Sequence, residues 1–296
     1  MYDSIVVGGG PAGLTAGIYL ARAGFKTLIL EKESIGGQIA SSPVVENYPG
    51  FTTISGSDLA SNMYEQAINY GVDIELENVI DIVLTPKKKV KTDYNEYECK
   101  TVIIATGSKY RKLGLSSENK FMGNSIHYCV SCDGFFYKDK TVAVIGGGNT
   151  AVINALYLAD IAKKVYLIEI CDELKCEKQN EEKLRSKSNV EIHLESSVEK
   201  FIGEDKLESI EIKTKDEIKN IKVDGVFESI GMAAQTELTS RLLDRNEYDY
   251  IISDDCKTKI DGIFVAGDCR TKDIRQLTTA TSDGTIAANL AIKYMR

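Results

Sequence analysis

Short apolar runs at residues 5–7, 101–107, 142–145 and 262–268 interrupt a mixed pattern of apolar and polar positions. Runs of this length, rich in valine and isoleucine, are typical of parallel strands that are buried on both faces. We therefore predict an α/β fold with parallel sheets. Helices are expected at 58–71 and 282–295 and a short β-meander at about 73–99, on the pattern of the intervening residues.

The segments 4–31 and 142–169 carry one pattern twice. Each has an apolar run, a glycine-rich turn, a helical stretch and a second apolar run that ends in glutamate. Two such units indicate an α/β protein of two Rossmann-like, three-layer dinucleotide-binding domains. The equivalent positions are Gly8, Gly9 and Gly10 with Gly146, Gly147 and Gly148, Gly13 with Ala151, and Glu31 with Glu169.

The chemistry of dinucleotide binding explains this pattern. The first glycine makes a tight turn, the second lets backbone N–H groups approach a pyrophosphate, and the third small residue lets the helix pack closely. The helix N-terminus then faces the phosphates with its partial positive charge. The terminal glutamate accepts hydrogen bonds from a ribose 2′-hydroxyl and repels a 2′-phosphate.

Composition narrows the class of protein. The chain has 296 residues, enough for two domains, and a formal net charge of −8, which argues against nucleic acid or an anionic membrane as a general partner. The first strand is expected within three residues of Met1, and no apolar run reaches membrane-spanning length. Seven cysteines without a secretory signal favour a reducing compartment, so we expect a cytoplasmic protein.

The order of the runs predicts an inserted domain. Because the run at 262–268 resembles the run at 101–107, we assign residues 1–111 and 243–296 to one discontinuous domain. Residues 112–242 then form a second domain inserted into the first.

A pair of cysteines is the main candidate for chemistry. Cys129 and Cys132 are separated by two residues and followed by Asp133. This spacing places both sulfurs at one helix N-terminus, where the dipole and free N–H groups lower a thiol pKa. The alternative is half of a zinc site completed by Cys171 and Cys176, whose four intervening residues are more than zinc usually spans within a pair.

Other cysteines and charged residues receive structural interpretations. Cys99, Cys256 and Cys269 fit buried small hydrophobic positions. His127 is interpreted as structural, with stabilisation of the Cys129 thiolate as the alternative. The lysines at 87–91 are interpreted as a solvated hairpin, with a docking patch for an acidic protein as the alternative.

The motifs occur in the order found in low-molecular-weight thioredoxin reductases, and the chain resembles that family over its full length. They are GGGPAG, GGQI, VENYPG, ATG, CVSCDG, GGGNTA, AGDCR and RQLTTATSDG. The resemblance implies a two-domain flavoprotein with FAD in the discontinuous domain and a redox-active dithiol in the inserted domain. It also implies a homodimer whose domains rotate, so that the dithiol meets the flavin and thioredoxin in turn.

By the same resemblance, the glycine turn would hold the FAD pyrophosphate, Glu31 the adenosine ribose and the Val79 backbone the adenine. Asp268 would hold the ribityl chain or a nearby phosphate. The expected FAD-binding residues are Gly8, Gly10, Pro11, Ala12, Gly13, Glu31, Gly37, Gln38, Asn47, Val79, Ala105, Thr106, Gly107, Asp268, Arg275 and Gln276. In the dithiol, Cys132 would take electrons from the flavin, Cys129 would attack the thioredoxin disulfide, and Asp133 would supply or take the proton.

The second unit departs from the NADPH-dependent members of the family. Those proteins follow the second strand with His-Arg-Arg and a further arginine, which bind the 2′-phosphate. Ile153 and Asn154 also replace a usual pair of acidic residues. NADPH is disfavoured, because the carboxylate at the first of the phosphate-binding positions would repel its phosphate. The residues at those positions are Glu169, Ile170, Cys171 and Lys175.

Two other electron donors fit the sequence. The chain resembles the ferredoxin-linked, pyridine-nucleotide-independent flavin thioredoxin reductases, and we favour reduced ferredoxin. NADH is the alternative, because GGGNTA is intact and Glu169 stands where NAD-binding units place their ribose carboxylate. A reductase for another small redox protein has the same chemistry and stays open. A ferredoxin–NADP reductase or a non-catalytic FAD module would leave the dithiol unexplained.

Overall fold

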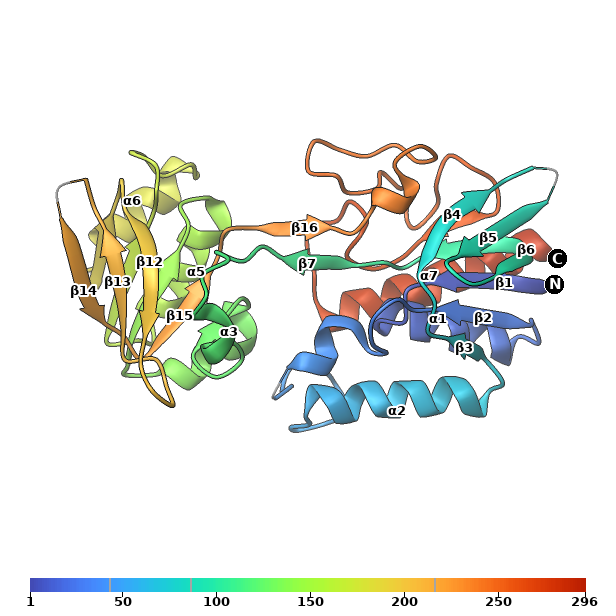
Figure 1. Ribbon diagram of the computed structural model, residues 1–296, viewed down its shortest axis with the longest axis horizontal. Helices are drawn as coiled ribbons and strands as arrows, with labels where there is room; N and C mark the ends of the chain where they lie inside the picture. Colours follow the sequence, from blue (N-terminus) through green and yellow to red (C-terminus); the bar gives the residue numbers. More distant parts are fainter. Residues whose placement is uncertain (43, 86, 216) are drawn as a thin grey trace. The chain divides into compact units, whose positions relative to one another are not determined.

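The computed structural model of the protein describes residues 1–42, 44–85, 87–215 and 217–296. Its contacts divide the chain into two units, drawn in Figure 1. Unit 1 comprises Met1–Lys109 and Ala233–Arg296, and unit 2 comprises Tyr110–Met232. The chain passes between the units in β7 (Ser108–Tyr110) and β16 (Met232–Ala234), which pair as a two-stranded sheet.

The second passage lies at residues 232–233, whereas the sequence placed it at 242–243. The residues between these points belong to the core of unit 1, where Leu238, Leu242 and Leu243 pack in one cluster with Ile5. Residues 232–242 contain no long apolar run, so the sequence pattern did not indicate this boundary.

Unit 1 is built on a seven-stranded sheet in the order β3-β2-β1-β6-β5-β4, with β17 paired to β6. Its strands are β1 (Tyr2–Val7), β2 (Thr27–Leu30), β3 (Asp73–Glu75), β4 (Val79–Val83), β5 (Lys88–Thr92), β6 (Glu96–Ile104) and β17 (Ile263–Val265). Its helices are α1 (Pro11–Arg22), α2 (Gly56–Asn69), α7 (Leu277–Met295) and the 3₁₀ helices η1 (Gly37–Ser41) and η3 (Glu237–Thr239).

The expected meander at 73–99 is only partly present. β3 lies parallel to β2 and extends the parallel sheet, while β4, β5 and β6 form the antiparallel part. β6 continues without a break into the predicted buried run. Its first half pairs with β5, and its second half pairs with β17 on the same edge. The antiparallel and parallel parts are therefore joined through one strand.

Strand alternation explains the core of unit 1, because successive side chains point to opposite faces of a sheet. Val6 and Ile103 face the helices α1, α2 and α7, and Ile5 and Val102 face the opposite cluster. All four are fully buried, as expected for parallel strands covered on both faces. The C-terminal helix begins at Leu277 rather than at 282, after a capping box formed by the residue before it and the third residue of the helix.

Unit 2 contains a five-stranded parallel sheet in the order β11-β10-β9-β15-β8 and an antiparallel sheet β12-β13-β14. The strands are β8 (Ile126–His127), β9 (Thr141–Ile145), β10 (Lys164–Ile168), β11 (Val190–His193), β12 (Ser197–Ile202), β13 (Ser209–Lys213), β14 (Ile218–Lys222) and β15 (Gly225–Glu228). The helices are α3 (Glu118–Phe121), α4 (Val130–Asp133), α5 (Asn149–Ala159), α6 (Lys178–Ser186) and the 3₁₀ helix η2 (Gly134–Tyr137).

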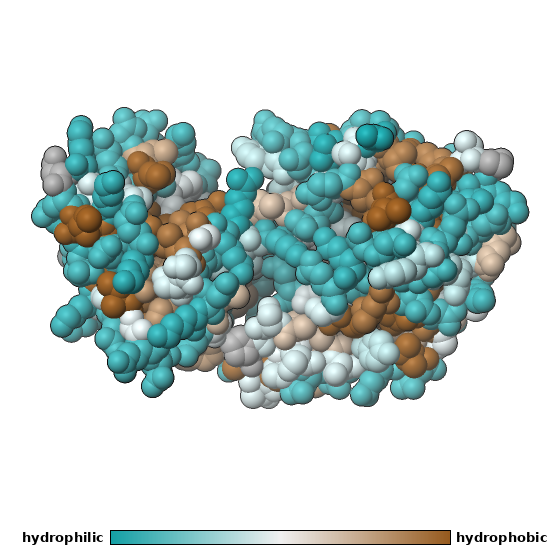
Figure 2. All heavy atoms as spheres, in the orientation of Figure 1, coloured by the Kyte–Doolittle hydropathy of each residue, from teal (hydrophilic) through white to brown (hydrophobic). Residues whose placement is uncertain are grey.

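The parallel sheet of unit 2 is also covered on both faces. Val142 and Val144 of β9 pack with residues of α5, whereas Ala143 and Ile145 pack with residues of β12 and β13. The predicted α/β class with helix, sheet and β layers is confirmed. Hydrophilic residues dominate the face shown in Figure 2, with small hydrophobic groups between them. Among the described residues, no helix has the length and apolar content needed to cross a bilayer.

Candidate active site

The first glycine turn lies between β1 and α1. Gly8 has a φ of +111°, and a Cβ on it would overlap the carbonyl group of Ala105. A Cβ on Gly13 would overlap the carbonyl oxygen of Gly8, so α1 packs directly on the turn. A Cβ on Gly10, by contrast, would have no atom within 4 Å among the described residues. The turn is fixed by packing on its inner side and open on the side where a pyrophosphate would lie.

Glu31 closes this turn from the end of β2. Its Oε2 accepts a hydrogen bond from the Gly9 backbone N–H at 2.7 Å, and its Oε1 accepts one from the Glu33 N–H at 2.9 Å. Each carboxylate oxygen has a second acceptor site. The side chain is therefore held in place and keeps acceptor capacity for a ribose hydroxyl.

A cavity of about 430 Å³ lies beside Glu31. It is found at the carboxyl ends of β1 and β2, where dinucleotides bind in folds of this kind. The cavity brings together Glu31 and Val79, which the sequence assigned to the adenosine end of FAD, and Gly8, which it assigned to the pyrophosphate. Its lining also includes Leu30, Asn78 and Thr106.

Two expected residues have buried polar atoms without a hydrogen-bond partner in the described part of the chain. These atoms are Thr106 Oγ1 and Arg275 Nε. Leaving such a group unpaired costs about 1–3 kcal/mol, so these atoms indicate where a polar ligand completes the site. Burial raises the pKa of the Asp268 carboxyl, and the Lys272 ammonium group at 3.4 Å opposes that rise.

The remaining expected FAD-binding residues also lie in unit 1. Asn47 Nδ2 donates to Gln276 Oε1 at 3.4 Å, and the Gln38 amide donates to the Ser108 carbonyl. Pro11 and Ala12 open α1, Gly37 begins η1, and Ala105, Thr106 and Gly107 follow β6. The residues assigned to FAD from the sequence thus belong to one unit, and Cys129, Cys132 and Asp133 belong to the other.

Sequence reasoning missed a buried ion cluster beneath this site. Asp283 on α7 is 4% exposed and accepts two hydrogen bonds from Arg270, at 2.8 and 2.9 Å, and one from Lys272 at 3.1 Å. Burial alone would raise the pKa of Asp283, but the hydrogen bonds from Arg270 and the charge of Lys272 lower it. The Gly267 N–H also donates to Asp283, at 3.0 Å. The cluster therefore fixes the segment that carries Asp268, and an aspartate inside an Ala- and Thr-rich helix was the available signal.

The two candidate redox cysteines are joined by a disulfide. Cys129 is the N-cap residue of α4, and the N–H groups of Cys132 and Asp133 donate to its carbonyl at 3.2 and 3.0 Å. The helix has a single turn, so its dipole is weaker than the sequence argument assumed. Cys171 and Cys176 are free thiols, and the described residues contain no group of three potential metal ligands, which leaves the zinc alternative without support.

The other free cysteines are buried, as expected for small hydrophobic positions. Cys99 and Cys256 lie in the two cores of unit 1, and burial raises the pKa of each thiol to about 12. Cys269 is fully buried, and burial raises the pKa of its thiol as well. These thiols are inert at physiological pH.

The second glycine turn repeats the first in backbone geometry. Gly146 has a φ of +124°, and a Cβ on Gly147 would overlap the carboxylate of Glu169. Glu169 Oε1 accepts a hydrogen bond from the Cys171 N–H at 2.8 Å. The Lys175 N–H donates to the Gly147 carbonyl at 2.9 Å. Glu169 therefore occupies the position that Glu31 occupies in unit 1.

The side chains around the second turn are unlike those around the first. Ile170 is 71% exposed and Ile153 is 53% exposed. The Asn154 amide donates to the Ser229 hydroxyl at 2.9 Å. Two apolar side chains of this unit are thus exposed, at positions that the sequence analysis compared with the NADPH-dependent members.

The lysines at 87–91 lie on the hairpin of β5 and β6, and their charges are mostly paired. Lys87 contacts Glu98 at 3.2 Å, Lys89 contacts Glu96 at 2.6 Å, and Lys91 contacts Asp81 at 3.9 Å. Pairing with carboxylates removes the net positive charge that a docking patch for an acidic protein needs.

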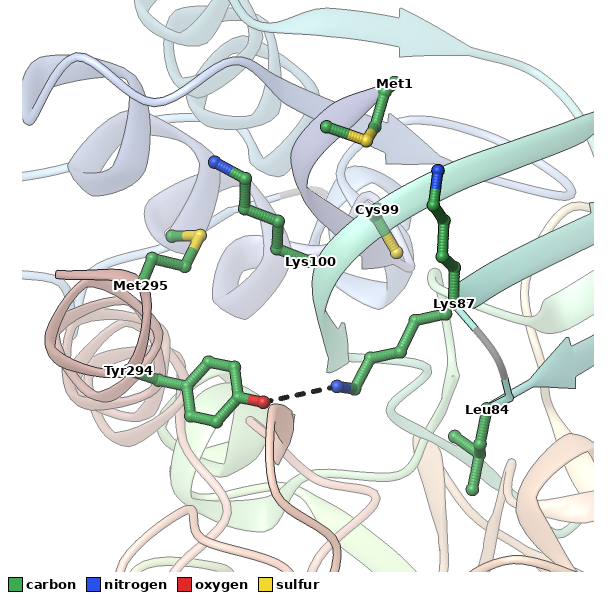
Figure 3. Close-up of a pocket in the computed structure, with 8 residues that line it drawn as sticks. Met1, Leu84, Lys87, Cys99, Lys100, Tyr294 and Met295 are labelled. Carbon is green, nitrogen blue, oxygen red and sulfur yellow. Dashed lines mark hydrogen bonds between the residues drawn. The ribbon is translucent and has the colours of Figure 1, made fainter.

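A second cavity of about 430 Å³ lies beside this hairpin, and Figure 3 shows the residues around it. Lys88 Nζ donates to the Tyr294 hydroxyl at 3.5 Å, and Lys100 forms an ion pair with Asp3 at 2.8 Å. The Cys99 sulfur lies in its lining. No residue assigned to FAD or to the dithiol lines this cavity.

Comparison with known proteins identifies the family. Residues 2–284 match the pyridine nucleotide-disulphide oxidoreductases. The chain belongs to this family. A "34.2 kDa protein in rubredoxin operon" of Clostridium pasteurianum is 44% identical over 99% of this chain and 97% of its own length. The thioredoxin reductase of Ureaplasma parvum is 40% identical over 100% of this chain and 97% of its own length.

Solved structures agree with the sequence relatives. The crystal structure of thioredoxin reductase from Streptococcus pyogenes has a TM-score of 0.94 and 38% identity, covering 99% of this chain and 98% of that chain. The predicted resemblance to low-molecular-weight thioredoxin reductases is confirmed, and so is the fold of two dinucleotide-binding units. The protein is a flavoprotein, and FAD, the cofactor expected from its sequence, is the cofactor of this family. The similarity to thioredoxin reductases over nearly the whole chain supports thioredoxin-disulfide reductase activity.

Proposed function

We propose that this protein is a thioredoxin-disulfide reductase that uses reduced ferredoxin as its electron donor. The observation that carries the proposal is the Cys129–Cys132 disulfide in a chain that matches this flavoprotein family over residues 2–284. When bound, FAD supplies two-electron redox chemistry. The residues of this chain hold the cofactor, carry the exchangeable disulfide and manage the protons.

Unit 1 would hold FAD through features that fit the cofactor. The open side of Gly10 accepts the pyrophosphate, and Glu31 accepts a hydrogen bond from the adenosine ribose. Buried polar atoms of Thr106 and Arg275 are available for the flavin end. These groups match FAD in kind, because they combine a phosphate-binding turn with donors and acceptors for ribose and ribityl hydroxyls.

The dithiol would carry electrons to thioredoxin. Cys132 would be the cysteine that exchanges electrons with the flavin, and Cys129 would attack the thioredoxin disulfide as a thiolate. Asp133 is the proposed proton donor and acceptor, since it directly follows Cys132 and its Oδ2 lies 3.4 Å from the His127 imidazole. A glutaredoxin-like or peroxidase partner would use the same steps.

The second glycine turn supports a donor other than NADPH. Glu169 presents a carboxylate where the 2′-phosphate would bind, and the neighbouring Ile170 is exposed and uncharged. Ile153 adds a second exposed apolar side chain in this unit. One relative is described as a protein in a rubredoxin operon, which supports a donor other than NADPH. Ferredoxin is the carrier that we propose here.

NADH is the second candidate, and one observation favours it. Glu169 accepts a hydrogen bond from the Cys171 N–H, as Glu31 accepts one from the Glu33 N–H, and its carboxylate lies next to Gly147. A carboxylate in this position binds the ribose of NAD in dinucleotide-binding folds.

We also propose that the protein acts as a homodimer in the cytoplasm. Five free cysteines are compatible with a reducing compartment. Light scattering of the flavin-loaded protein measures the assembly directly, and a mass of one chain at micromolar concentration would contradict the dimer.

An anaerobic assay tests the proposed function. Reduced ferredoxin, the protein and oxidised thioredoxin are mixed, and thioredoxin thiols are counted. Cys129→Ser and Cys132→Ser should each abolish turnover, and Cys132→Ser should trap a mixed disulfide through Cys129. Cys171→Ser is the matched control, because it removes a partly exposed free thiol and should leave turnover unchanged.

Two outcomes separate the alternatives. If thioredoxin is reduced with NADH and not with ferredoxin, NADH is the electron donor and the assignment as a thioredoxin reductase still holds. Reduction of a small aromatic disulfide without reduction of thioredoxin would mean that another redox protein is the substrate. Wild-type activity in either dithiol variant would overturn the dithiol assignment itself.

A further inference from the structure

A chain of three polar side chains leads from the dithiol into the interior of unit 2. His127 Nδ1 lies 3.4 Å from Asp133 Oδ2. His127 Nε2 lies 2.7 Å from the Tyr137 hydroxyl oxygen. The Tyr137 hydroxyl can also donate to the Asn124 carbonyl, at 3.4 Å. The three side chains thus form a continuous path that begins at the residue after Cys132.

This path is enclosed by the core of unit 2. His127 is 8% exposed and Tyr137 is 4% exposed. The imidazole stacks on the Phe227 ring, with centroids 5.4 Å apart. A Cβ on Gly225 would overlap the Tyr137 ring, so the glycine leaves room for the tyrosine. Because water is largely excluded, the polar atoms of this path depend on one another as hydrogen-bond partners.

The charges around the path keep Tyr137 neutral. Burial raises the pKa of its hydroxyl, and the negative charges of Asp133 and Asp224 raise it further. Lys140 Nζ lies 5.2 Å from the centroid of the Tyr137 ring and is the facing cation. The hydroxyl therefore stays protonated over the range in which thiols titrate. It can donate to His127 Nε2 or turn to the Asn124 carbonyl and accept a hydrogen bond from Nε2–H.

These two orientations couple the imidazole to the dithiol. When Tyr137 donates to Nε2, the ring carries its proton on Nδ1 and donates toward Asp133 as a carboxylate. When Tyr137 turns to Asn124, Nε2 carries a proton, and Nδ1 can take or return a proton shared with Asp133. Rotation of one hydroxyl thus accommodates both protonation states of the pair without leaving a buried atom unpaired.

We propose that His127 is a positioning residue for the dithiol reaction, which orients Asp133 and shares with it the proton that the cysteines exchange with the substrate. The proposal rests on the proposed function in one respect, namely that Cys129 and Cys132 reduce a disulfide substrate.

The proton and electron balance of the step is as follows. Cys129 first gives its thiol proton to the Asp133–His127 pair, and the resulting thiolate attacks one sulfur of the substrate disulfide. The S–S bond of the substrate breaks, and the leaving thiolate takes that proton from the pair. Cys132 then gives its thiol proton to the pair and attacks Cys129 in the mixed disulfide. The second substrate thiolate leaves and takes that proton. Two electrons and two protons pass from the dithiol to the substrate, and the Asp133–His127 pair returns to its first state.

The first test measures the pH dependence of a single turnover. The flavin-loaded protein is reduced with dithionite, freed of reductant, and mixed anaerobically with oxidised thioredoxin or with the small disulfide 5,5′-dithiobis(2-nitrobenzoate). His127→Gln should slow the reaction about tenfold and move the midpoint of its pH profile. Tyr137→Phe keeps the ring packing and should shift the profile in the same direction by a smaller amount.

His193→Gln is the matched control, because it changes the other histidine of the chain, which contacts Glu191 at 3.1 Å rather than the dithiol segment. Its rate and profile should match wild type. A wild-type rate and pH profile in flavin-loaded His127→Gln would overturn the proposal. Failure with thioredoxin alone, with the small disulfide still reduced through Cys129 and Cys132, would instead count against the proposed substrate.

A second measurement works without any variant of the path. The chain has two histidines, so ¹⁵N-histidine labelling gives two imidazole spin systems, and His193→Gln assigns them. The ring signals of His127 should report a different tautomer or protonation midpoint when the dithiol is reduced, whereas those of His193 should not change. Identical His127 signals in the oxidised and reduced protein at every pH would contradict proton sharing.

Discussion

The two glycine turns of this protein share a backbone design and differ in the side chains around it. In both turns the first glycine has a positive φ, and a glutamate at the end of the next strand accepts a backbone N–H. Around the first turn lie a cavity and buried polar atoms without partners. Around the second, exposed isoleucines stand at Ile153 and Ile170.

This difference teaches that the glycine motif reports the dinucleotide-binding fold, whereas the residues at its rim decide the ligand. Glu31 and Glu169 each accept a hydrogen bond from the N–H two residues further along the chain, but their neighbours differ. A ligand needs the open turn, the carboxylate and a set of polar groups beyond them. The predictions below test whether the two copies now have separate tasks.

The largest effect is expected from matched valine substitutions at Gly10 in the first turn and Gly148 in the second. Gly10 and Gly148 both border open space, and neither has a positive φ, so valine fits the fold at both positions. Gly10→Val should fold but lose flavin, because its side chain fills the pyrophosphate position. Gly148→Val should keep full flavin occupancy. The ratio of visible to ultraviolet absorbance after purification measures both, and equal flavin content in the two variants would break the comparison.

A smaller effect is expected from the two strand-end glutamates. Glu31→Gln should weaken flavin binding about tenfold to a hundredfold, because a charge-assisted hydrogen bond to the ribose is worth about 1.5–3 kcal/mol. Glu169→Gln should leave the flavin dissociation constant unchanged. Fluorescence titration of the apoprotein with FAD measures both constants. A weakened flavin affinity in Glu169→Gln would contradict the assignment of the cofactor to unit 1.

The two units also differ in the strand that pairs with the first strand of each motif, which is β6 in unit 1 and β15 in unit 2. Glu228 pairs in register with Ile145 of β9, as Ile104 pairs with Val7 of β1, so a buried carboxyl in unit 2 replaces a buried isoleucine of unit 1. Burial, and next the charge of Glu118, raise the pKa of Glu228 from 4.5 to about 8.

The sign of this shift gives a pH dependence. The folded protein keeps a proton that the unfolded chain releases, so the contribution of Glu228 to stability is fully present below about pH 4.5 and is lost as the pH rises to about 8. The slope is at most about 1.4 kcal/mol per pH unit. Glu228→Gln should flatten the fall of unfolding free energy between pH 5 and pH 8, measured by urea titration. The exposed Glu204→Gln is the control, and an unchanged slope in Glu228→Gln would count against a buried, proton-binding carboxyl.

The smallest effect concerns Cys171, which follows Glu169 by two residues. A hydrogen bond to Glu169 raises the pKa of the Cys171 thiol. Glu169→Gln should therefore speed alkylation of Cys171 by iodoacetamide at pH 8 about twofold to fivefold. Mass spectrometry of the labelled peptide gives the rate, and the buried Cys99 serves as the unlabelled internal control. A slower reaction in the variant would show that the carboxylate does not hold the thiol proton.

Local patterns sufficed to predict much of this molecule. Apolar runs gave the strands at 5–7, 101–104 and 142–145, and the spacing of glycine and glutamate predicted both turns. The register-dependent features were not predictable. The sharing of β6 between β5 and β17, and the passage at 232–233, follow from pairings between residues distant in sequence.

Parts of the site that lie in one short sequence motif could be predicted. Parts formed by residues distant in sequence could not. Glu31 and the dithiol can be read from spacing alone. The Asp283 cluster and the path from His127 to Tyr137 join residues whose neighbours are set only by packing. The paired charges of the lysine hairpin likewise depend on the strand register that brings Glu96 opposite Lys91.

The central claim is that the first turn holds FAD while the second no longer serves NADPH. The most direct test is anaerobic titration of the flavin-loaded protein with NADPH, NADH and reduced ferredoxin, followed by the visible flavin band. We expect reduced ferredoxin to bleach the band stoichiometrically and NADPH to leave it unchanged at micromolar concentration. Rapid bleaching by micromolar NADPH would contradict the account, because Glu169 and Ile170 would then have to tolerate the 2′-phosphate that they are argued to exclude.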